Sequence, residues 1–249
     1  MKIAVCVKAV PDAASGRRID PSTLRLDRSG ELAISEFDTY AIEEALRLSE
    51  AGVGEVVAIS MGPERAMDAL RKALAMGADR ATLISDPALE GADLLGTAEA
   101  LAGALAAETP ELVLFGQQSA DGGGACLWAA VAERLRRPVI SQVSELAVAD
   151  GHVTGKRQTE FGYDVIRAPL PAVVAVSDAI NTPRYPSLKG IMGAKKKPQE
   201  TVTASVTVAA ATSVLALAPP APRGDARRID DDGSAAEQIV EFLVEKRLL

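Results

Sequence analysis

This chain of 249 residues contains few of the side chains that most often carry catalysis or bind metal ions. It has one histidine, His152, which lies in the turn-like string ADGH, so a mechanism based on imidazole acid–base chemistry is not expected. Its two cysteines, Cys6 and Cys126, have neither metal-ligand spacing nor a disulfide framework, which is typical of a reducing compartment. We therefore expect no catalytic residue and no metal site.

Long apolar runs and an excess of positive charge are also absent. No run reaches about 18 apolar residues, and the sequence enters a strand-like segment at once, without a signal-peptide pattern. These features predict a cytoplasmic protein that does not insert into a membrane. The formal charge of −7 argues against general nucleic-acid binding. The local basic run at 195–197 is either a solvated edge or a contact for a partner or a phosphate.

The sequence does contain a repeated alternation of strand and helix signals, and 48% of its residues are apolar. Strands are expected at 3–7, 55–59, 81–85, 111–116 and 170–177. Asp38 is expected to cap the first helix, Pro63 to lie in the first turn of the second, and Gly77 to end the second; further helices are expected at 93–107 and up to Leu135. Such repeated units predict an α/β fold with an open, mainly parallel sheet and helices on both faces, a Rossmann-like three-layer arrangement.

The pattern changes after residue 139. Shorter strand signals at 143–148, 153–160 and 163–167 predict a small antiparallel excursion. Residues 198–228 are rich in Ala, Thr, Val and Pro, and the capping-box spacing of Ser234 and Glu237 predicts the start of an amphipathic terminal helix. We therefore expect an α/β domain at 1–197 and an arm with a helix at 198–249. The arm either folds back on its own domain or reaches a partner.

The strongest local sign of a ligand site is the string GQQSADGGGA at 116–125, where a predicted strand runs into a glycine-rich turn and then a helix. Glycines let backbone N–H groups approach an anion closely, and a helix N-terminus adds partial positive charge. The turn is therefore suited to hold a phosphate. Because the string matches neither GxxxxGK[ST] nor GxGxxG, a plain tight connection is the alternative.

A second unusual segment, NTPRYPSLKGIMGAKKK at 181–197, places apolar residues between prolines and lysines. Pro183 and Pro186 fix φ and disfavour regular helix or ladder pairing, so we expect Leu188 to be presented from a stiff loop at low entropic cost. This pattern is typical of a docking segment. The candidate docking residues are Arg184, Tyr185, Pro186, Leu188, Ile191 and Met192.

Several strings together resemble the β subunits of electron-transfer flavoproteins. They are RYPSLKGIM followed by AKKK and preceded by LPAVV, VCVKAVPD at 5–12, EEALRL at 43–48, and SMGPERAMDALRKALAMGADRA at 60–81. The resemblance covers nearly the whole chain. It implies an adenine-nucleotide α-hydrolase-like fold and an electron-carrier subunit that is not itself an enzyme, with residues 184–193 as the recognition loop.

The resemblance also implies the partners. An α subunit would hold the redox FAD and be contacted by the arm of this chain. Electrons would arrive from flavin dehydrogenases such as acyl-CoA dehydrogenases and leave through a quinone oxidoreductase toward the respiratory quinone pool.

The cofactor implied for this chain is a buried AMP, and in electron-bifurcating relatives an FAD takes that place. Carried over by matching residues, the nucleotide site comprises Cys6, Ser35, Glu36, Phe37, Asp38, Met61, Gln118, Asp121, Gly122, Gly123, Gly124, Ala125, Cys126 and Trp128. Phe37 and Met61 are alternatively ordinary core or lid residues, and Cys6 is alternatively a small buried apolar residue.

The chain departs from the common family pattern at the phosphate loop. Many members have a threonine, a glutamine and a Gly-Pro pair where this chain has Gly124, Cys126, Trp128 and Ala129. Thr182 stands where an acidic residue is frequent, and the signature loop reads QTEFGYD at 158–164. These changes leave open whether AMP or FAD is bound. A nucleotide-processing enzyme of the same fold is the alternative from another class, but it would need a serine or lysine set in the phosphate loop together with converging acids, and the turn carries only Asp121.

Overall fold

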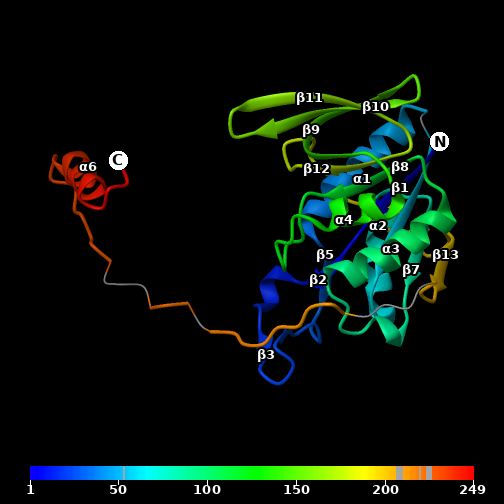
Figure 1. Ribbon diagram of the computed structural model, residues 1–249, viewed down its shortest axis with the longest axis horizontal. Coiled ribbons are helices and arrows are strands. Elements are labelled where there is room, and N and C mark those ends of the chain that lie inside the picture. Colours follow the sequence, from blue (N-terminus) through cyan, green and yellow to red (C-terminus); the bar gives the residue numbers. More distant parts are fainter. Residues whose placement is uncertain (53, 206–209, 219, 223–225) are drawn as a thin grey trace. The chain divides into compact units, whose positions relative to one another are not determined.

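The structure, a computed structural model, describes residues 1–52, 54–205, 210–218, 220–222 and 226–249. The chain divides into two compact units, Met1–Val214 and Leu215–Leu249. Within the described residues, the first unit builds a sheet of nine strands in the order β11-β10-β9-β12-β8-β1-β6-β7-β13 (Figure 1).

The strands from β9 to β13 in this order pair in parallel, and β10 and β11 extend the same sheet antiparallel. Their bounds are β1 (Lys2–Cys6), β6 (Glu55–Met61), β7 (Arg80–Ile84), β8 (Leu112–Gly116), β9 (Val139–Ala149), β10 (His152–Thr159), β11 (Gly162–Pro169), β12 (Ala172–Val176) and β13 (Gln199–Val202). The predicted mainly parallel sheet with an antiparallel excursion is confirmed. The strand predicted at 143–148 is longer than expected, because β9 begins at Val139, where it pairs in parallel with β12.

Helices cover both faces of the sheet, as predicted. They are α1 (Glu36–Glu50), α2 (Met67–Met76), α3 (Leu94–Glu108), α4 (Leu127–Leu135) and the short α5 (Leu188–Ala194). The alternating side chains of the central strand β1 show the layering. Ile3 and Val5 pack in one cluster with α1 and α2, whereas Ala4 and Cys6 pack in another with α3 and α4. Both clusters are almost fully buried, so the sheet forms the middle of three layers.

Helix ends follow the sequence in part. Gly77 ends α2 with φ +148°, and the carboxylate of Asp93 caps α3 by accepting a hydrogen bond from the Gly96 N–H group at 2.9 Å. The predicted capping role of Asp38 is wrong, because α1 begins at Glu36 with Ser35 at the N-cap position. Asp38 lies instead within the first turn of α1, where it is buried.

Between β1 and α1 the chain forms two small antiparallel pairs that the sequence analysis did not foresee. They are β2 (Ala9–Pro11) with β5 (Leu32–Ile34), and β3 (Ile19–Asp20) with β4 (Arg25–Leu26). Three short 3-10 turns complete the unit, η1 (Ala13–Ser15), η2 (Glu64–Ala66) and η3 (Pro87–Leu89). The prediction that Pro63 lies in the first turn of the second helix is wrong, because Pro63 is the N-cap residue of η2 and α2 begins only at Met67.

The second unit contains the predicted terminal helix, α6 (Ala235–Glu245), with Ser234 at its N-cap position. The Ser234 hydroxyl makes no cap bond; it accepts from the Gln238 side chain at 2.9 Å. The apolar side chains of Ile239, Val240 and Val244 are about half exposed. None of the described helices is both long and apolar enough to cross a bilayer. A domain boundary at 197/198 stays a prediction, and residues just beyond it form β13.

Candidate functional site

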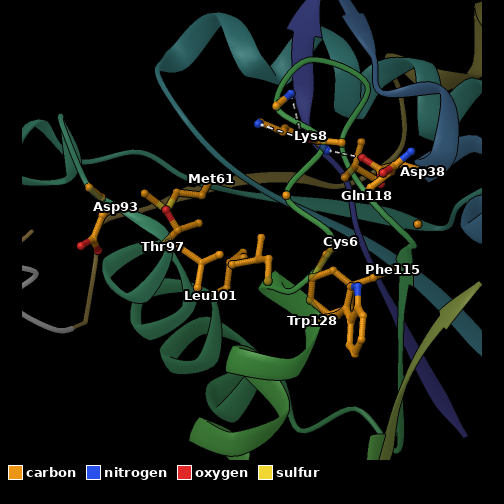
Figure 2. A pocket seen from close by; sticks show the side chains of 18 residues that line it. Cys6, Lys8, Asp38, Met61, Asp93, Thr97, Leu101, Phe115, Gln118 and Trp128 are labelled. Carbon is orange, nitrogen blue, oxygen red and sulfur yellow. Dashed lines mark hydrogen bonds between the residues drawn. The ribbon is translucent and has the colours of Figure 1, made fainter. Parts of the chain in front are cut away.

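A cavity of about 380 Å³ opens at the carboxyl ends of β1, β6 and β8 (Figure 2). The chain continues from β1 to β6 on one side of β1, while β8 joins β1 from the other side. Open parallel sheets bind their ligands at such a switch in strand order, because the loops diverge there and leave a crevice. The cavity is lined by Cys6, Val7, Lys8, Asp38, Met61, Ala92, Asp93, Leu94, Thr97, Leu101, Phe115, Gly116, Gln118, Ser119, Gly122, Gly124, Leu127 and Trp128.

The residues predicted for a nucleotide site divide into two groups. Those that line the cavity are Cys6, Asp38, Met61, Gln118, Gly122, Gly124 and Trp128. Those that do not are Ser35, Glu36, Phe37, Asp121, Gly123, Ala125 and Cys126. Some of the second group support the first: the buried Ser35 hydroxyl accepts a hydrogen bond from the Ala120 N–H group at 3.1 Å and so braces the glycine turn.

Several lining residues were missed by the sequence analysis. Lys8 and Phe115 lie at or just beyond strand ends, so their position at the carboxyl edge of the sheet was a usable signal. Thr97 and Leu101 belong to the first half of α3, and no local pattern marks them. Their place at the cavity depends on how the chain crosses over the sheet between β7 and β8.

One side of the cavity is apolar and aromatic. Figure 2 shows Trp128, Phe115 and Cys6 on one side of the space, with Leu101 and Met61 across from them. The indole N–H group of Trp128 donates to the Gln117 carbonyl at 3.0 Å, which fixes the ring. A slot of this kind suits a flat heteroaromatic base, which gains from apolar burial and ring contact.

The opposite end of the cavity is polar. The ammonium group of Lys8 lies 2.8 Å from the carboxylate of Asp121 and 3.4 Å from the Ser119 hydroxyl, which also accepts from the Gly122 N–H group at 3.3 Å. Lys8 keeps 42% of its side chain exposed. At Gly123 φ is +60°, a conformation that favours glycine. A cation and glycine N–H groups together suit an anionic group such as a phosphate.

Asp121 is the electrostatic centre of the glycine turn. Its side chain is 2% exposed and pairs with both Lys8 and Arg28. Burial would raise the pKa of the Asp121 carboxyl, but hydrogen bonds and charge from Lys8 and Arg28 outweigh it and hold the pKa well below its ordinary value. Asp121 therefore stays anionic and ties the turn to the segments after β1.

Asp38 has the opposite electrostatic situation. Its carboxylate accepts a hydrogen bond from the Lys8 N–H group at 2.7 Å, yet burial raises its pKa to about 7. Burial, with the nearby charge of Asp38, also raises the pKa of the Cys6 thiol, so Cys6 is a neutral apolar side chain rather than a nucleophile. The first turn of α1 lies tight against β8, because a Cβ added at Gly116 would come within 2.5 Å of the Phe37 carbonyl carbon.

Arginines tie the small hairpin after β1 to the rim of this cavity. Arg17 donates to the Ala120 carbonyl at 2.5 Å, and Arg25 donates to the Gly91 carbonyl at 3.0 Å. These contacts come from residues distant in sequence and hold both sides of the opening. Among the described residues, no group of three or more His, Cys, Asp or Glu side chains is arranged to hold a metal ion.

The proposed docking segment leaves its apolar side chains in solvent. Tyr185 is 95% exposed, Leu188 75% and Met192 68%. The prediction of a loop holds up to Ser187, but from Leu188 onward it is wrong, because α5 begins there. Pro183 and Pro186 precede the helix and do not interrupt it, and the Ser187 hydroxyl caps it by accepting from the Gly190 N–H group at 3.0 Å.

The model of the electron transfer flavoprotein domain matches residues 23–207. The chain belongs to the electron transfer flavoprotein family, as a β subunit. It is 39% identical to the electron transfer flavoprotein subunit beta of Mycobacterium leprae over 99% of each chain, and 35% identical to that of Megasphaera elsdenii over the full length of each.

A third relative has a different name. The Caffeyl-CoA reductase-Etf complex subunit CarD of Acetobacterium woodii is 40% identical over 80% of this chain and 76% of its own length. Membership in the family makes this chain an electron-carrier subunit that has an α subunit as its partner. The predicted family is thus confirmed, whereas the nucleotide and the electron donors stay predictions.

Proposed function

We propose that this chain is the AMP-binding β subunit of a heterodimeric, cytoplasmic electron transfer flavoprotein. It docks flavin dehydrogenases such as acyl-CoA dehydrogenases, and the complex passes their electrons through a quinone oxidoreductase toward the respiratory quinone pool. The redox FAD belongs to the α subunit or to the subunit interface, and it supplies all the electron chemistry. Residues 1–197 form the nucleotide-binding body, and residues 198–249, apart from β13 in the sheet of the body, form the arm that contacts the α subunit.

The observation that carries this proposal is the cavity with one aromatic and one cationic end. Trp128, Phe115 and Leu101 suit the adenine base, and Lys8 with the glycine turn suits a single phosphate. The residues present therefore fit an adenylate. AMP bound here would be held between the strand ends and the residues of α3 and α4 that line the cavity, and it would take no part in electron transfer.

Docking is assigned to the exposed apolar residues around α5. Leu188 is the proposed apolar anchor that a dehydrogenase would bury, with Tyr185, Ile191 and Met192 around it. All four side chains are exposed. A small apolar anchor on a fixed backbone gives specific binding that dissociates rapidly, which suits a carrier that must meet several dehydrogenases.

A second candidate places FAD in the AMP position, as in a bifurcating complex. One observation favours it: the relative named as a subunit of a Caffeyl-CoA reductase-Etf complex. The glycine-rich turn, which lacks the threonine and glutamine common in the family, is compatible with either nucleotide. An enzymatic nucleotide-processing role has less support. The structure does bring Lys8 near Ser119, but the Lys8 ammonium group is already paired with Asp121.

Co-expression with the α subunit, followed by acid extraction of the purified complex, distinguishes these proposals. One FAD and one AMP per heterodimer support the first, and two FAD support the second. A complex with one FAD and no adenylate overturns the assignment of the cavity.

A matched pair of variants tests the cavity itself. We expect Lys8→Met to reduce the AMP content of the complex while its FAD content is unchanged. Lys195→Met, which removes an exposed lysine far from the cavity in sequence, serves as the control. Equal AMP content in both variants contradicts the phosphate role of Lys8.

A further inference from the structure

The docking segment has an unusual combination of a fixed backbone and exposed apolar side chains. Its apolar residues are among the most exposed of the described chain, yet the residues at both ends of the segment are tied to helices of the body. Exposed apolar side chains do little to stabilise a segment in one conformation. Its position therefore comes from polar contacts at its two ends and from α5 packing on α2, where Ala194 is buried in the core of the body.

Arg184 provides the largest set of these contacts. Its guanidinium group donates to Glu43 at 2.8 and 3.1 Å and to Glu50 at 2.5 and 3.0 Å, and its backbone N–H group donates to Glu43 at 3.2 Å. Both carboxylates lie on α1, and the Glu43 side chain is only 8% exposed. A planar guanidinium that bridges two carboxylates fixes direction as well as distance. Arg184 therefore locks the start of the segment onto α1.

A second contact to the same helix lies just before Arg184. The side-chain amide of Asn181 donates to the Tyr40 carbonyl at 3.0 Å and to Glu44 at 3.1 Å. Together, Asn181 and Arg184 bind the segment to α1 over more than two helical turns, from Tyr40 to Glu50. A rotation of the segment about either contact alone is thereby prevented.

The other end of the segment is fixed to α2. The ammonium group of Lys197 donates to the carbonyls of Leu74, Gly77 and Ala78 at 3.1, 2.9 and 2.6 Å, where α2 ends. A cation satisfies the free carbonyls of a helix C-terminus well. The basic run at 195–197 is thus divided, because Lys195 and Lys196 are exposed while Lys197 is a structural contact.

Between these ends, α5 lies directly on α2. A Cβ added at Gly190 would come within 2.4 Å of the Ala75 carbonyl oxygen, so the two backbones approach closely. Leu188 precedes this contact by two residues and Met192 follows it by two. The contact therefore fixes the distance of these exposed side chains from α2.

We propose that Arg184 is a positioning residue for docking: by locking the segment to α1, with Lys197 as the tether on α2, it presents Leu188 in the geometry that a dehydrogenase binds. This inference rests on the docking role proposed above. Arg184 touches α1 rather than the dehydrogenase in this role, which differs from its prediction as a docking residue. A segment already held in one conformation loses less entropy on binding. We therefore expect the loss of the Arg184 contacts to weaken the affinity for the donor dehydrogenase.

The test compares Arg184→Gln with Arg47→Gln in the purified heterodimer. Arg47 is a matched control because it is also an arginine beside α1 carboxylates, but its contact is a single one to Glu44 at 3.6 Å. We expect Arg184→Gln to raise the KM for the donor dehydrogenase by about tenfold, with kcat unchanged. Amide hydrogen exchange of residues 185–194 should speed up in Arg184→Gln and not in Arg47→Gln. Arg184→Lys should recover part of both effects.

The outcomes separate this inference from the function on which it rests. If Leu188→Ala raises KM but Arg184→Gln behaves like Arg47→Gln in KM and exchange, the positioning role is overturned alone. If neither Leu188→Ala nor Arg184→Gln changes KM, the docking role fails and this inference fails with it. If Arg184→Gln does not assemble, Glu50→Gln decides the matter, because Glu50 is 59% exposed and its loss spares the buried Glu43 contact. An unchanged KM and exchange rate in Glu50→Gln would then overturn the positioning role.

Discussion

Replacing Leu188 by alanine is the most direct test of the docking surface. Leu188 is 75% exposed at the start of α5, so the substitution removes little from the folded core. Any large effect must therefore come from a bound state in which a partner buries the side chain. The change separates the role in docking from the role in folding.

The size of the effect follows from the buried area. The substitution removes three carbon atoms, and burial is worth about 0.8 kcal/mol for each CH₂ group. Since three quarters of the side chain is available to a partner, the loss is about 2 kcal/mol of binding free energy, or about 30-fold in affinity. A side chain at the rim of an interface would lose much less.

The assay is the reduction of the heterodimer by a donor dehydrogenase over a range of donor concentrations. We expect a raised KM and an unchanged kcat, because the substitution changes the docking surface and does not change the surroundings of the flavin. Leu95→Ala is the control, since Leu95 is 47% exposed on α3 and has no proposed docking role. A KM within twofold of that of the Leu95→Ala control would refute the assignment of Leu188.

Two further predictions concern the cavity. Asp38 has a folded pKa of about 7 against an ordinary value of 3.8, so its contribution to stability is full below pH 3.8 and is lost as pH rises through 7. The unfolding free energy of the heterodimer should therefore fall between pH 5.5 and 8 by about 2 kcal/mol more than in Asp38→Asn, and equal slopes would contradict the assigned pKa. Gly116→Ala forces a Cβ to within 2.5 Å of Phe37, so we expect a loss of about 1–3 kcal/mol and of bound adenylate. Gly30→Ala meets nothing within 4 Å and serves as its control; the same unfolding midpoint in both variants would show that the close approach is not required.

The framework of the fold was predictable because its signals are local. Apolar runs such as those of β1 and β8 mark buried parallel strands, and Gly77 marks a helix end, so short windows of sequence suffice. The pairs β2–β5 and β3–β4 were not predicted. Each strand has only two or three residues, and distant contacts such as the Arg25 bond to Gly91 hold the segment.

The candidate site was predictable in part for the same reason. The glycine turn gave Gln118, and the resemblance to the family gave Cys6 and Met61; all three line the cavity. The α3 side of the cavity, with Leu101, depends on the crossover between β7 and β8 and leaves no local mark. The sequence predicts Asp38 as a helix cap because aspartate is common at N-caps. A buried aspartate in the first turn of a helix has the same local sequence, so the two cases are distinguished only by the fold.

Helix α1 borders both proposed sites, with Asp38 at the cavity and Glu43 and Glu50 under the docking segment. The two sites are therefore not separable modules along this helix. Any evolutionary or engineered change that widens the cavity by shifting α1 also tilts the surface seen by electron donors. Retuning the choice of donor is easier on α5, whose outward side chains can be exchanged while the body stays as it is.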